Sequence, residues 1–229
     1  MELKQVASYM NGRYLISNLK KDKKALLSGE LLKSCSVDSL GASKQEIQYY
    51  DTPELFFATH GINIYTVLIG KSKELIIRYD GSQVQRIDFL KNIPNFFKIA
   101  LKDPREGITN YFEEINTAIY KVFPEGLHVN IDDMLRNSQP RVIIRKKNDD
   151  YRVVNNNGLK TTISFSNSTF INVRTGAKFV QEQLEVLAES NMNKDLFTTF
   201  LRSIILDCPQ LIRLDNNELT IAINYFRVN

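Results

Sequence analysis

Basic side chains recur at even spacings in the segment RVIIRKK, residues 141–147. Arg141, Arg145 and Lys147 are separated by four and two positions. Because side chains alternate between the two faces of a β-strand, a strand in this segment places all three on one face. Guanidinium and ammonium groups gathered in this way can hold phosphate oxygens, whereas a charged strand end can equally face solvent. The pattern therefore indicates either an anion-binding face or a solvated one.

Other residue types that commonly do chemistry are sparse. Cys35 and Cys208 stand far apart and match no metal-binding spacing. His60 and His128 have no neighbours in the sequence suited to a nucleophilic or metal site. The segment IGKSKE, residues 69–74, lacks the GxxxxGK[ST] spacing of a phosphate-binding loop. These observations exclude the common zinc, P-loop and nucleophile motifs as sources of function.

Length, composition and charge fit an ordinary globular protein. The 229 residues are 43% hydrophobic, which predicts one domain over residues 1–229. The formal net charge of +4 is mild; it permits a polyanionic ligand, and no motif indicates nucleic acid. The N-terminus lacks a signal-peptide pattern, and no apolar run is long enough to span a bilayer, so we expect a cytoplasmic protein. The sequence does not indicate an oligomeric state.

The elements that would position the basic residues are mostly strands. Alternating apolar patterns and turn residues predict strands over residues 62–69, 73–79, 83–90, 140–147, 150–155, 159–166, 178–187 and 218–226. Asn11-Gly12 predicts a hairpin between two short N-terminal strands, and the Ser-rich segment 34–43 predicts a loop. Helical spacing predicts helices over residues 20–35 and 194–206, and a mostly helical insert over about 91–137. The fold class is therefore α+β with a large antiparallel sheet, either open or closed into a barrel.

The segment YYDTPELFFATHGINIYTV, residues 49–67, predicts a junction from one strand through a short helix to the next strand. Asp51 or Thr52 can cap the helix, Pro53 suits its first position, and Gly61 is the expected stop. On these grounds alone the segment describes a connection and no function.

The same segment resembles the signature of the CYTH superfamily, the triphosphate tunnel metalloenzymes, whose members commonly read YFDTP followed by an apolar turn and Gly-Ile-x-Leu. The order of LIIR at 75–78, the helical insert, RVIIRKK and QLEVL at 183–187 is also similar to that family over most of the chain. The resemblance implies an antiparallel barrel of about eight strands. It also implies basic side chains inside the barrel that hold a triphosphate, and acidic ones that hold a divalent metal.

Carried over by position, the resemblance implies a set of phosphate-binding residues. They are Lys4, Arg78, Arg86, Arg141, Arg145 and Lys147. Two arginines that the family carries shortly after its glycine are replaced here by Tyr65 and Val67. Since tyrosine donates one hydrogen bond and valine none, a reduced affinity for anions is expected.

The acidic side of the implied site is sparser. Of the family's N-terminal Glu-x-Glu-x-Lys only Glu2 and Lys4 remain, and a family aspartate is replaced by Ser166 or Asn167. The last strand of the implied barrel points Gln181, Gln183, Glu185, Leu187 and Glu189 inward. Glu2 and Glu185 could together hold one Mg²⁺ or Mn²⁺. Alternatively, Glu185 is an inward residue paired with one of the arginines.

Three functions follow as alternatives. The first is a protein that binds a phosphorylated, triphosphate-like ligand in the basic half of the cavity, with weak or no catalysis. The second is a Mg²⁺- or Mn²⁺-dependent triphosphatase acting on inorganic, thiamine or nucleoside triphosphate. The third is a structural or protein-interaction module whose cavity is filled by side chains. Since hydrolysis fails sooner from lost metal ligands than anion binding does from lost arginines, the first is favoured.

Overall fold

The structure is a computed structural model that describes residues 4–6, 11–79, 96–101, 103, 105, 107–122, 129–189, 192–214 and 218–228. Its strands are β1 (Lys4–Val6), β2 (Asn11–Leu15), β3 (Ser36–Asp51), β4 (Ile62–Ile69), β5 (Ser72–Tyr79), β6 (Phe96–Ala100), β7 (Gln139–Val154), β8 (Lys160–Asn172), β9 (Lys178–Ala188) and β10 (Ile212–Arg213). Its helices are α1 (Leu19–Ser28), α2 (Glu30–Lys33), α3 (Phe56–Thr59), α4 (Phe112–Val122), α5 (Ile131–Arg136), α6 (Lys194–Asp207) and α7 (Glu218–Val228).

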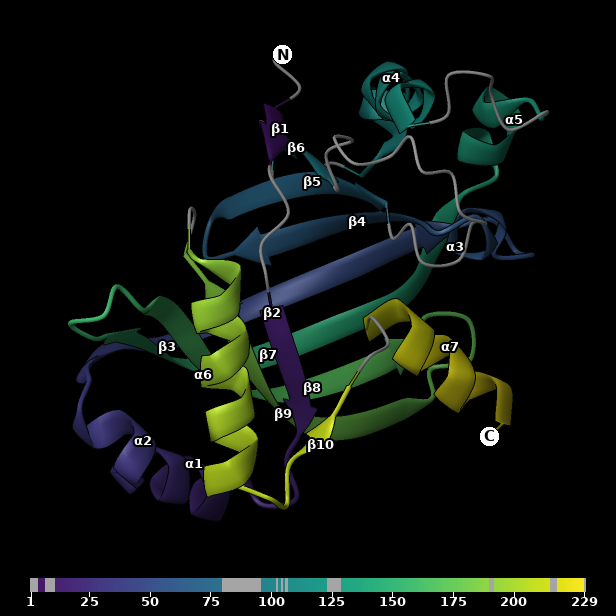
Figure 1. The fold of residues 1–229 in the computed structure, drawn as a ribbon. Coiled ribbons are helices and arrows are strands. Elements are labelled where there is room, and N and C mark those ends of the chain that lie inside the picture. Colours follow the sequence, from purple (N-terminus) through teal and green to yellow (C-terminus); the bar gives the residue numbers. More distant parts are fainter. Residues whose placement is uncertain are drawn as a thin grey trace.

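The described strands form one antiparallel sheet in the order β1-β6-β5-β4-β3-β7-β8-β9-β2-β10. In this order β1 and β2 lie eight strand-to-strand steps apart, which corresponds to about 38 Å in a flat sheet. In the sequence, however, Val6 and Asn11 are separated by five residue steps, and these span at most about 18 Å. The sheet must therefore curve strongly enough to bring its two ends together, as the ribbon in Figure 1 shows.

The expected large antiparallel α+β sheet is thus confirmed, whereas a closed barrel is not. The two edge strands, β1 and β10, do not pair with each other among the described residues, so hydrogen bonds leave the sheet open. The expected N-terminal hairpin is wrong, because β1 pairs with β6 and β2 pairs with β9. Gly12 serves close packing instead of a turn: a Cβ there would lie 2.7 Å from Leu201 Cδ2 of α6.

The helices cover two regions of one face of the sheet and one region of the other. α4 and α5 pack over β4, β5 and β6, and α1, α2 and α6 pack over β2, β8 and β9. Figure 1 shows both groups on the outside of the curve and α7 across its opening. α7 contacts the opposite face, which we call the inner face, through Leu219 and Ala222. None of the helices in the described ranges is both long and apolar enough to cross a bilayer.

Several predicted elements are confirmed and others are corrected. The strand 62–69 and the helix 194–206 are found as β4 and α6, while the loop expected over 34–43 lies almost entirely within the long strand β3. The insert 91–137 contains α4 and α5 but also β6, which joins the sheet. The strand expected over 218–226 is helix α7, because its core-facing residues Leu219 and Ala222 recur at helical spacing. The strand expected over 83–90 lies outside the described residues.

The DTP junction forms as the sequence predicts, with one difference in detail. The Asp51 carboxylate accepts hydrogen bonds from the backbone N–H groups of Thr52, Phe57 and Ala58 at 2.7, 2.9 and 2.9 Å. The Thr52 hydroxyl accepts a hydrogen bond from the N–H of Phe56 at 3.1 Å. Pro53 lies before the helix and not in it, because α3 is a single turn that begins at Phe56. A buried carboxylate therefore organises the connection between β3 and β4.

Replacing Asp51 with alanine is expected to lower the free energy of unfolding by at least about 2 kcal/mol, measured by urea denaturation. The reason is that two N–H groups of α3 and one preceding it lose a buried acceptor. Glu54→Ala is the matched control, since Glu54 is exposed in the same junction, and its effect should stay within about 0.5 kcal/mol. Equal effects of the two variants would contradict this assignment.

Candidate functional site

The inner face changes from apolar to polar along β7, β8, β9 and β2. Val142, Ile144 and Phe170 belong to the apolar part, which packs against α7. Because side chains alternate along each strand, the same face continues into a polar part. The register places these polar residues there: Arg13, Lys146, Asn148, Ser164, Ser166, Ser168, Gln183 and Glu185. We call these residues, together with Glu218 of α7, the polar cluster.

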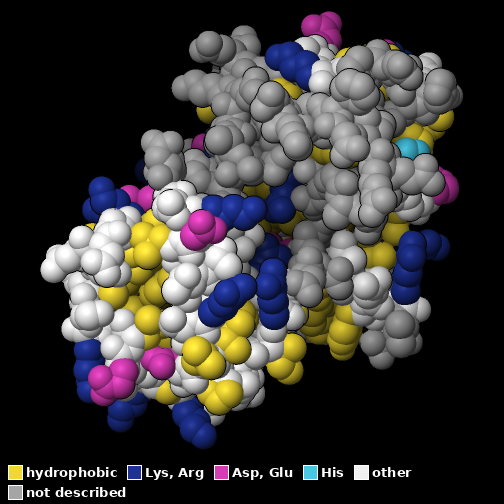
Figure 2. Space-filling view, viewed as in Figure 1, with side chains coloured by type: hydrophobic (Ala, Val, Ile, Leu, Met, Phe, Trp, Pro, Cys, Tyr) yellow, Lys and Arg dark blue, Asp and Glu magenta, His cyan; other side chains and the backbone are white. Residues whose placement is uncertain are grey.

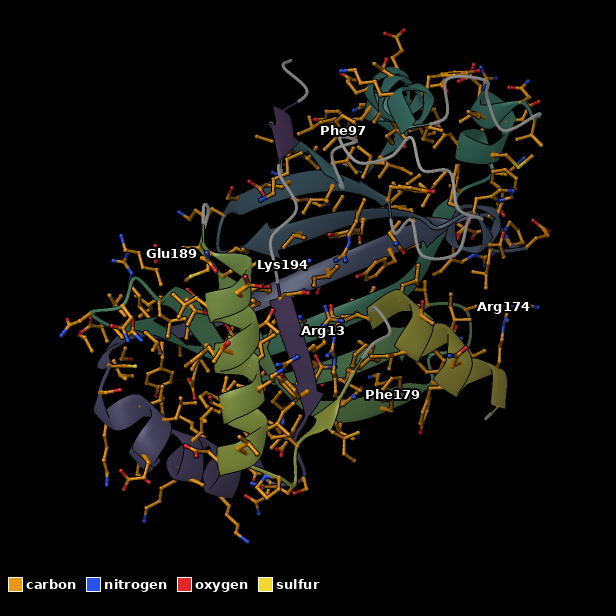
Figure 3. All side chains as sticks on the ribbon, viewed as in Figure 1. Arg13, Phe97, Arg174, Phe179, Glu189 and Lys194 are labelled. Carbon is orange, nitrogen blue, oxygen red and sulfur yellow. The ribbon has the colours of Figure 1, made fainter. Side chains whose placement is uncertain are left out.

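Two ion pairs join the charged members of the polar cluster. Lys146 Nζ lies 2.5 Å from Glu218 Oε1, and the exposed fractions of the two side chains are only 7% and 5%. Arg13 Nη2 lies 3.5 Å from Glu185 Oε1, with exposed fractions of 11% and 18%. In Figure 3, Arg13 lies on β2 in front of the strands β7 to β9. Charged groups this deeply buried are retained only when they are paired, so the two pairs define the centre of the site.

The four charged groups also act on one another across the pairs. Burial tends to raise the pKa of Glu185, but the nearby Lys146 and Arg13 outweigh it and hold this pKa below its ordinary value. Burial tends to lower the pKa of Arg13, but Glu218 and Glu185 raise it above its ordinary value. Both groups therefore stay charged at neutral pH, and each cation interacts with both carboxylates.

Tyr49 and Arg78 extend this network towards β3 and β5. Burial raises the pKa of the Tyr49 hydroxyl well above its ordinary value, and the carboxylate of Glu218 adds to the effect while Arg13 and Arg78 oppose it. Tyr49 also lies against Tyr65, with ring centroids 4.9 Å apart. Arg78, which the resemblance implies as a phosphate-binding residue, therefore lies near Tyr49, on the same face of the sheet as the polar cluster. Figure 2 shows Lys and Arg side chains along and above β2 in the middle of the viewed face.

Three buried polar atoms on uncharged side chains of the cluster have no hydrogen-bond partner among the described residues. They are Asn148 Oδ1, Ser168 Oγ and Gln183 Nε2. The three side chains are 6%, 0% and 1% exposed and lie on neighbouring strands β7, β8 and β9. Since buried polar atoms in folded proteins are almost always hydrogen-bonded, these atoms indicate a place for a polar ligand or ordered water.

Three of the other basic residues implied by the resemblance lie on the outer face. Arg141, Arg145 and Lys147 do share one face of β7, as their even spacing predicts, but it is the face opposite to Lys146. Arg145 Nε donates to Glu46 Oε2 at 2.9 Å and its side chain is 63% exposed. Arg141 Nε donates to the carbonyl oxygen of Thr52 at 3.2 Å, which ties it to the DTP junction.

The remaining predicted residues divide between the sheet and the undescribed part of the chain. Lys4 lies in β1 opposite Lys98 of β6, whereas Arg86 and Glu2 fall outside the described residues. As the sequence predicts, the side chains of Gln183 and Glu185 on β9 point to the inner face, where they belong to the polar cluster. Glu185 pairs with Arg13, and not with an arginine of β7.

Three central residues, Arg13, Lys146 and Glu218, were absent from the set that the sequence indicated. Lys146 had a usable signal, because it continues the buried alternation of Val142 and Ile144 into the polar half of β7. The sequence predicts Arg13 in an N-terminal hairpin and Glu218 in a strand. Neither prediction brings Arg13 to β9 or Glu218 to β7.

The described residues do not fit a divalent metal such as Mg²⁺ or Mn²⁺. No three Asp, Glu, His or Cys side chains are grouped for metal binding in the described part of the chain. Both carboxylates of the polar cluster face a cationic side chain that already neutralises them. Mg²⁺ requires oxygen ligands whose charge is available to it, so these two pairs compete with such an ion.

Comparison with solved structures identifies the fold. A "putative adenylate cyclase" from Bacillus halodurans superimposes with a TM-score of 0.57 at 7% identity, covering 93% of this chain and 96% of that one. A "putative adenylyl cyclase" from Hippeastrum, described as having a dominant triphosphatase activity, superimposes with a TM-score of 0.58 at 11% identity, covering 95% and 96%. By sequence, neither a protein-family model nor a curated protein matches the chain. The shared fold agrees with the CYTH resemblance at the level of architecture.

Proposed function

We propose that the chain binds a phosphorylated, triphosphate-like anion on the inner face, without a divalent metal and without hydrolysing it. The observation that carries this proposal is the grouping of buried cations and neutral hydrogen-bond donors on the inner face. Arg13 and Lys146 lie on this face together with Ser168 and Gln183, and the strand register places Arg78 on the same face. In such a poorly hydrated place the attraction of a cation for an anion is stronger than in water.

The hydrogen-bonding groups of the inner face support the same proposal. A triphosphate presents almost only acceptor oxygens at neutral pH and needs several donors. Arginine and lysine supply charge-assisted donors, and the buried Ser168 hydroxyl and Gln183 amide supply neutral ones. The phosphate-binding set that we propose is therefore Arg13, Arg78, Lys146, Ser168 and Gln183, in place of the outer-face residues Arg141, Arg145 and Lys147.

The absence of hydrolysis is proposed from the charge requirements of phosphoryl transfer. In-line attack by water on a triphosphate normally requires metal ions to neutralise charge as it develops. The paired carboxylates Glu185 and Glu218 do not fit that task. The triphosphatase activity of the Hippeastrum protein favours a second candidate, a metal-dependent triphosphatase in which Glu2 would be a metal ligand and Arg86 would bind phosphate.

Calorimetric titration of sodium triphosphate into the protein separates the two candidates. With EDTA present, we expect saturable binding of triphosphate. A second titration with Mg²⁺ in place of EDTA should give no higher affinity, and no inorganic phosphate should be released during prolonged incubation. Binding seen only with Mg²⁺ or Mn²⁺, together with phosphate release, would establish the second candidate. Failure to bind triphosphate under either condition would contradict both.

A further inference from the structure

The first residue of α7 places a carboxylate against the cations to which we assign anion binding. Glu218 Oε1 lies 2.5 Å from Lys146 Nζ, and the Glu218 residue is 4% exposed. Among the groups that raise the pKa of Arg13, Glu218 has the largest single effect. The Glu218 carboxylate is therefore an anion already placed within the positively charged part of the inner face.

Apolar packing, and not the ion pair alone, sets the position of Glu218. Leu219 and Ala222 of α7 are buried against the inner face, with exposed fractions of 2% and 0%. At the other end of the helix, the rings of Phe179 and Tyr225 stack with centroids 4.0 Å apart. Figure 3 shows Phe179 on β9 directly beside α7. Apolar contacts at both ends of α7 therefore fix the position of Glu218.

We propose that α7 is an internal competitor for the ligand, so that an anion reaches Lys146 and Arg13 only when the Glu218 carboxylate moves away. This competition rests on the proposed function and would regulate it. A carboxylate and a phosphate group are both oxyanions, and both use the N–H donors of lysine and arginine. A carboxylate brings one negative charge whereas a triphosphate brings about four, so the triphosphate displaces Glu218 at a cost in affinity.

Glu218→Gln is the variant that tests this competition. The amide keeps the shape of the side chain and can still accept a hydrogen bond from Lys146, but it carries no charge. We expect Glu218→Gln to bind triphosphate at least about tenfold more tightly than the wild type in EDTA, measured by calorimetry. The control is Glu46→Gln, which makes the same change in the exposed ion pair with Arg145 and should leave the affinity unchanged.

Leu219→Ala supplies a second variant that retains every charge. It removes a buried anchor of α7 and should also tighten binding, because the helix then leaves the inner face more easily. Circular dichroism establishes which variants are folded. If Glu218→Gln is unfolded, Leu219→Ala decides whether α7 competes with the ligand. Hydrogen exchange of the α7 amides should also increase when triphosphate is added to the wild type.

The outcomes distinguish this inference from the function on which it rests. Binding by the wild type that neither variant tightens would overturn the competition and leave the proposed function standing. Equal gains for Glu218→Gln and Glu46→Gln would also overturn it, because they would indicate a general effect of charge. If the wild type and both α7 variants all fail to bind triphosphate, both proposals are overturned. Binding by the α7 variants but not by the wild type would support the competition and overturn the proposed binding by the wild-type chain.

Discussion

Replacing Lys146 with methionine is expected to lower the free energy of unfolding by about 3–5 kcal/mol, measured by urea denaturation at neutral pH. Lys146 and Glu218 are both almost completely buried, and their charges lie 2.5 Å apart. Methionine fills a similar volume but leaves the Glu218 carboxylate without its closest cation. The cost is therefore mainly that of a buried and uncompensated negative charge.

Two further variants separate this cost from a simple packing defect. The double variant Lys146→Met with Glu218→Met removes both charges and should recover most of the lost stability, since a buried ion pair can often be replaced by apolar residues. Lys147→Met changes the neighbouring residue of the same type, whose side chain is exposed, and should alter stability by less than about 0.5 kcal/mol. A double variant as unstable as Lys146→Met would contradict the pairing.

The second large effect concerns ligand binding through Arg13. Arg13→Gln should weaken triphosphate binding in EDTA by about 30-fold or more, which corresponds to about 2 kcal/mol. Arg13 is the cation of the polar cluster that can contact two phosphate oxygens at once, and glutamine offers neither its charge nor its planar fork of donors. Calorimetric titration of the folded variant gives the dissociation constant directly.

Arg145→Gln is the matched control for Arg13→Gln, because both arginines pair with a glutamate but lie on opposite faces of the sheet. Its affinity for triphosphate should equal that of the wild type at the same salt concentration. A loss of binding in Arg145→Gln with none in Arg13→Gln would move the site to the outer face. That result would restore the set of basic residues implied by the sequence resemblance.

Much of the sheet could be predicted because its signals are local. The strand β4 follows from the alternation of its side chains. The junction follows from capping by Asp51 and from Gly61, because glycine readily adopts the positive φ of 70° observed there. The pairing of β2 with β9 could not be predicted, because Asn11-Gly12 has the composition of a hairpin turn. The glycine instead leaves room for Leu201, a residue far away in the sequence, since a Cβ at position 12 would lie 2.7 Å from Leu201 Cδ2.

The candidate site was harder to predict because it depends on which side chains of β7 point to the inner face. Arg145 and Lys147 share a face with each other, but only Lys146 shares the buried face of Ile144. A shift of one residue exchanges the two sets completely. Glu218 reaches the site only because residues 218–228 form a helix that packs on the inner face, which is a tertiary effect that local pattern does not determine.

The binding site can be located by a crystal structure of the protein with triphosphate bound in the presence of EDTA. We expect phosphate oxygens within hydrogen-bond distance of Arg13, Arg78 and Lys146 on the inner face, with Glu218 displaced from Lys146. Triphosphate bound to Arg145 and Lys147 on the outer face would contradict the assignment of the site. Triphosphate that enters the crystal only when Mg²⁺ or Mn²⁺ is supplied would contradict metal-independent binding.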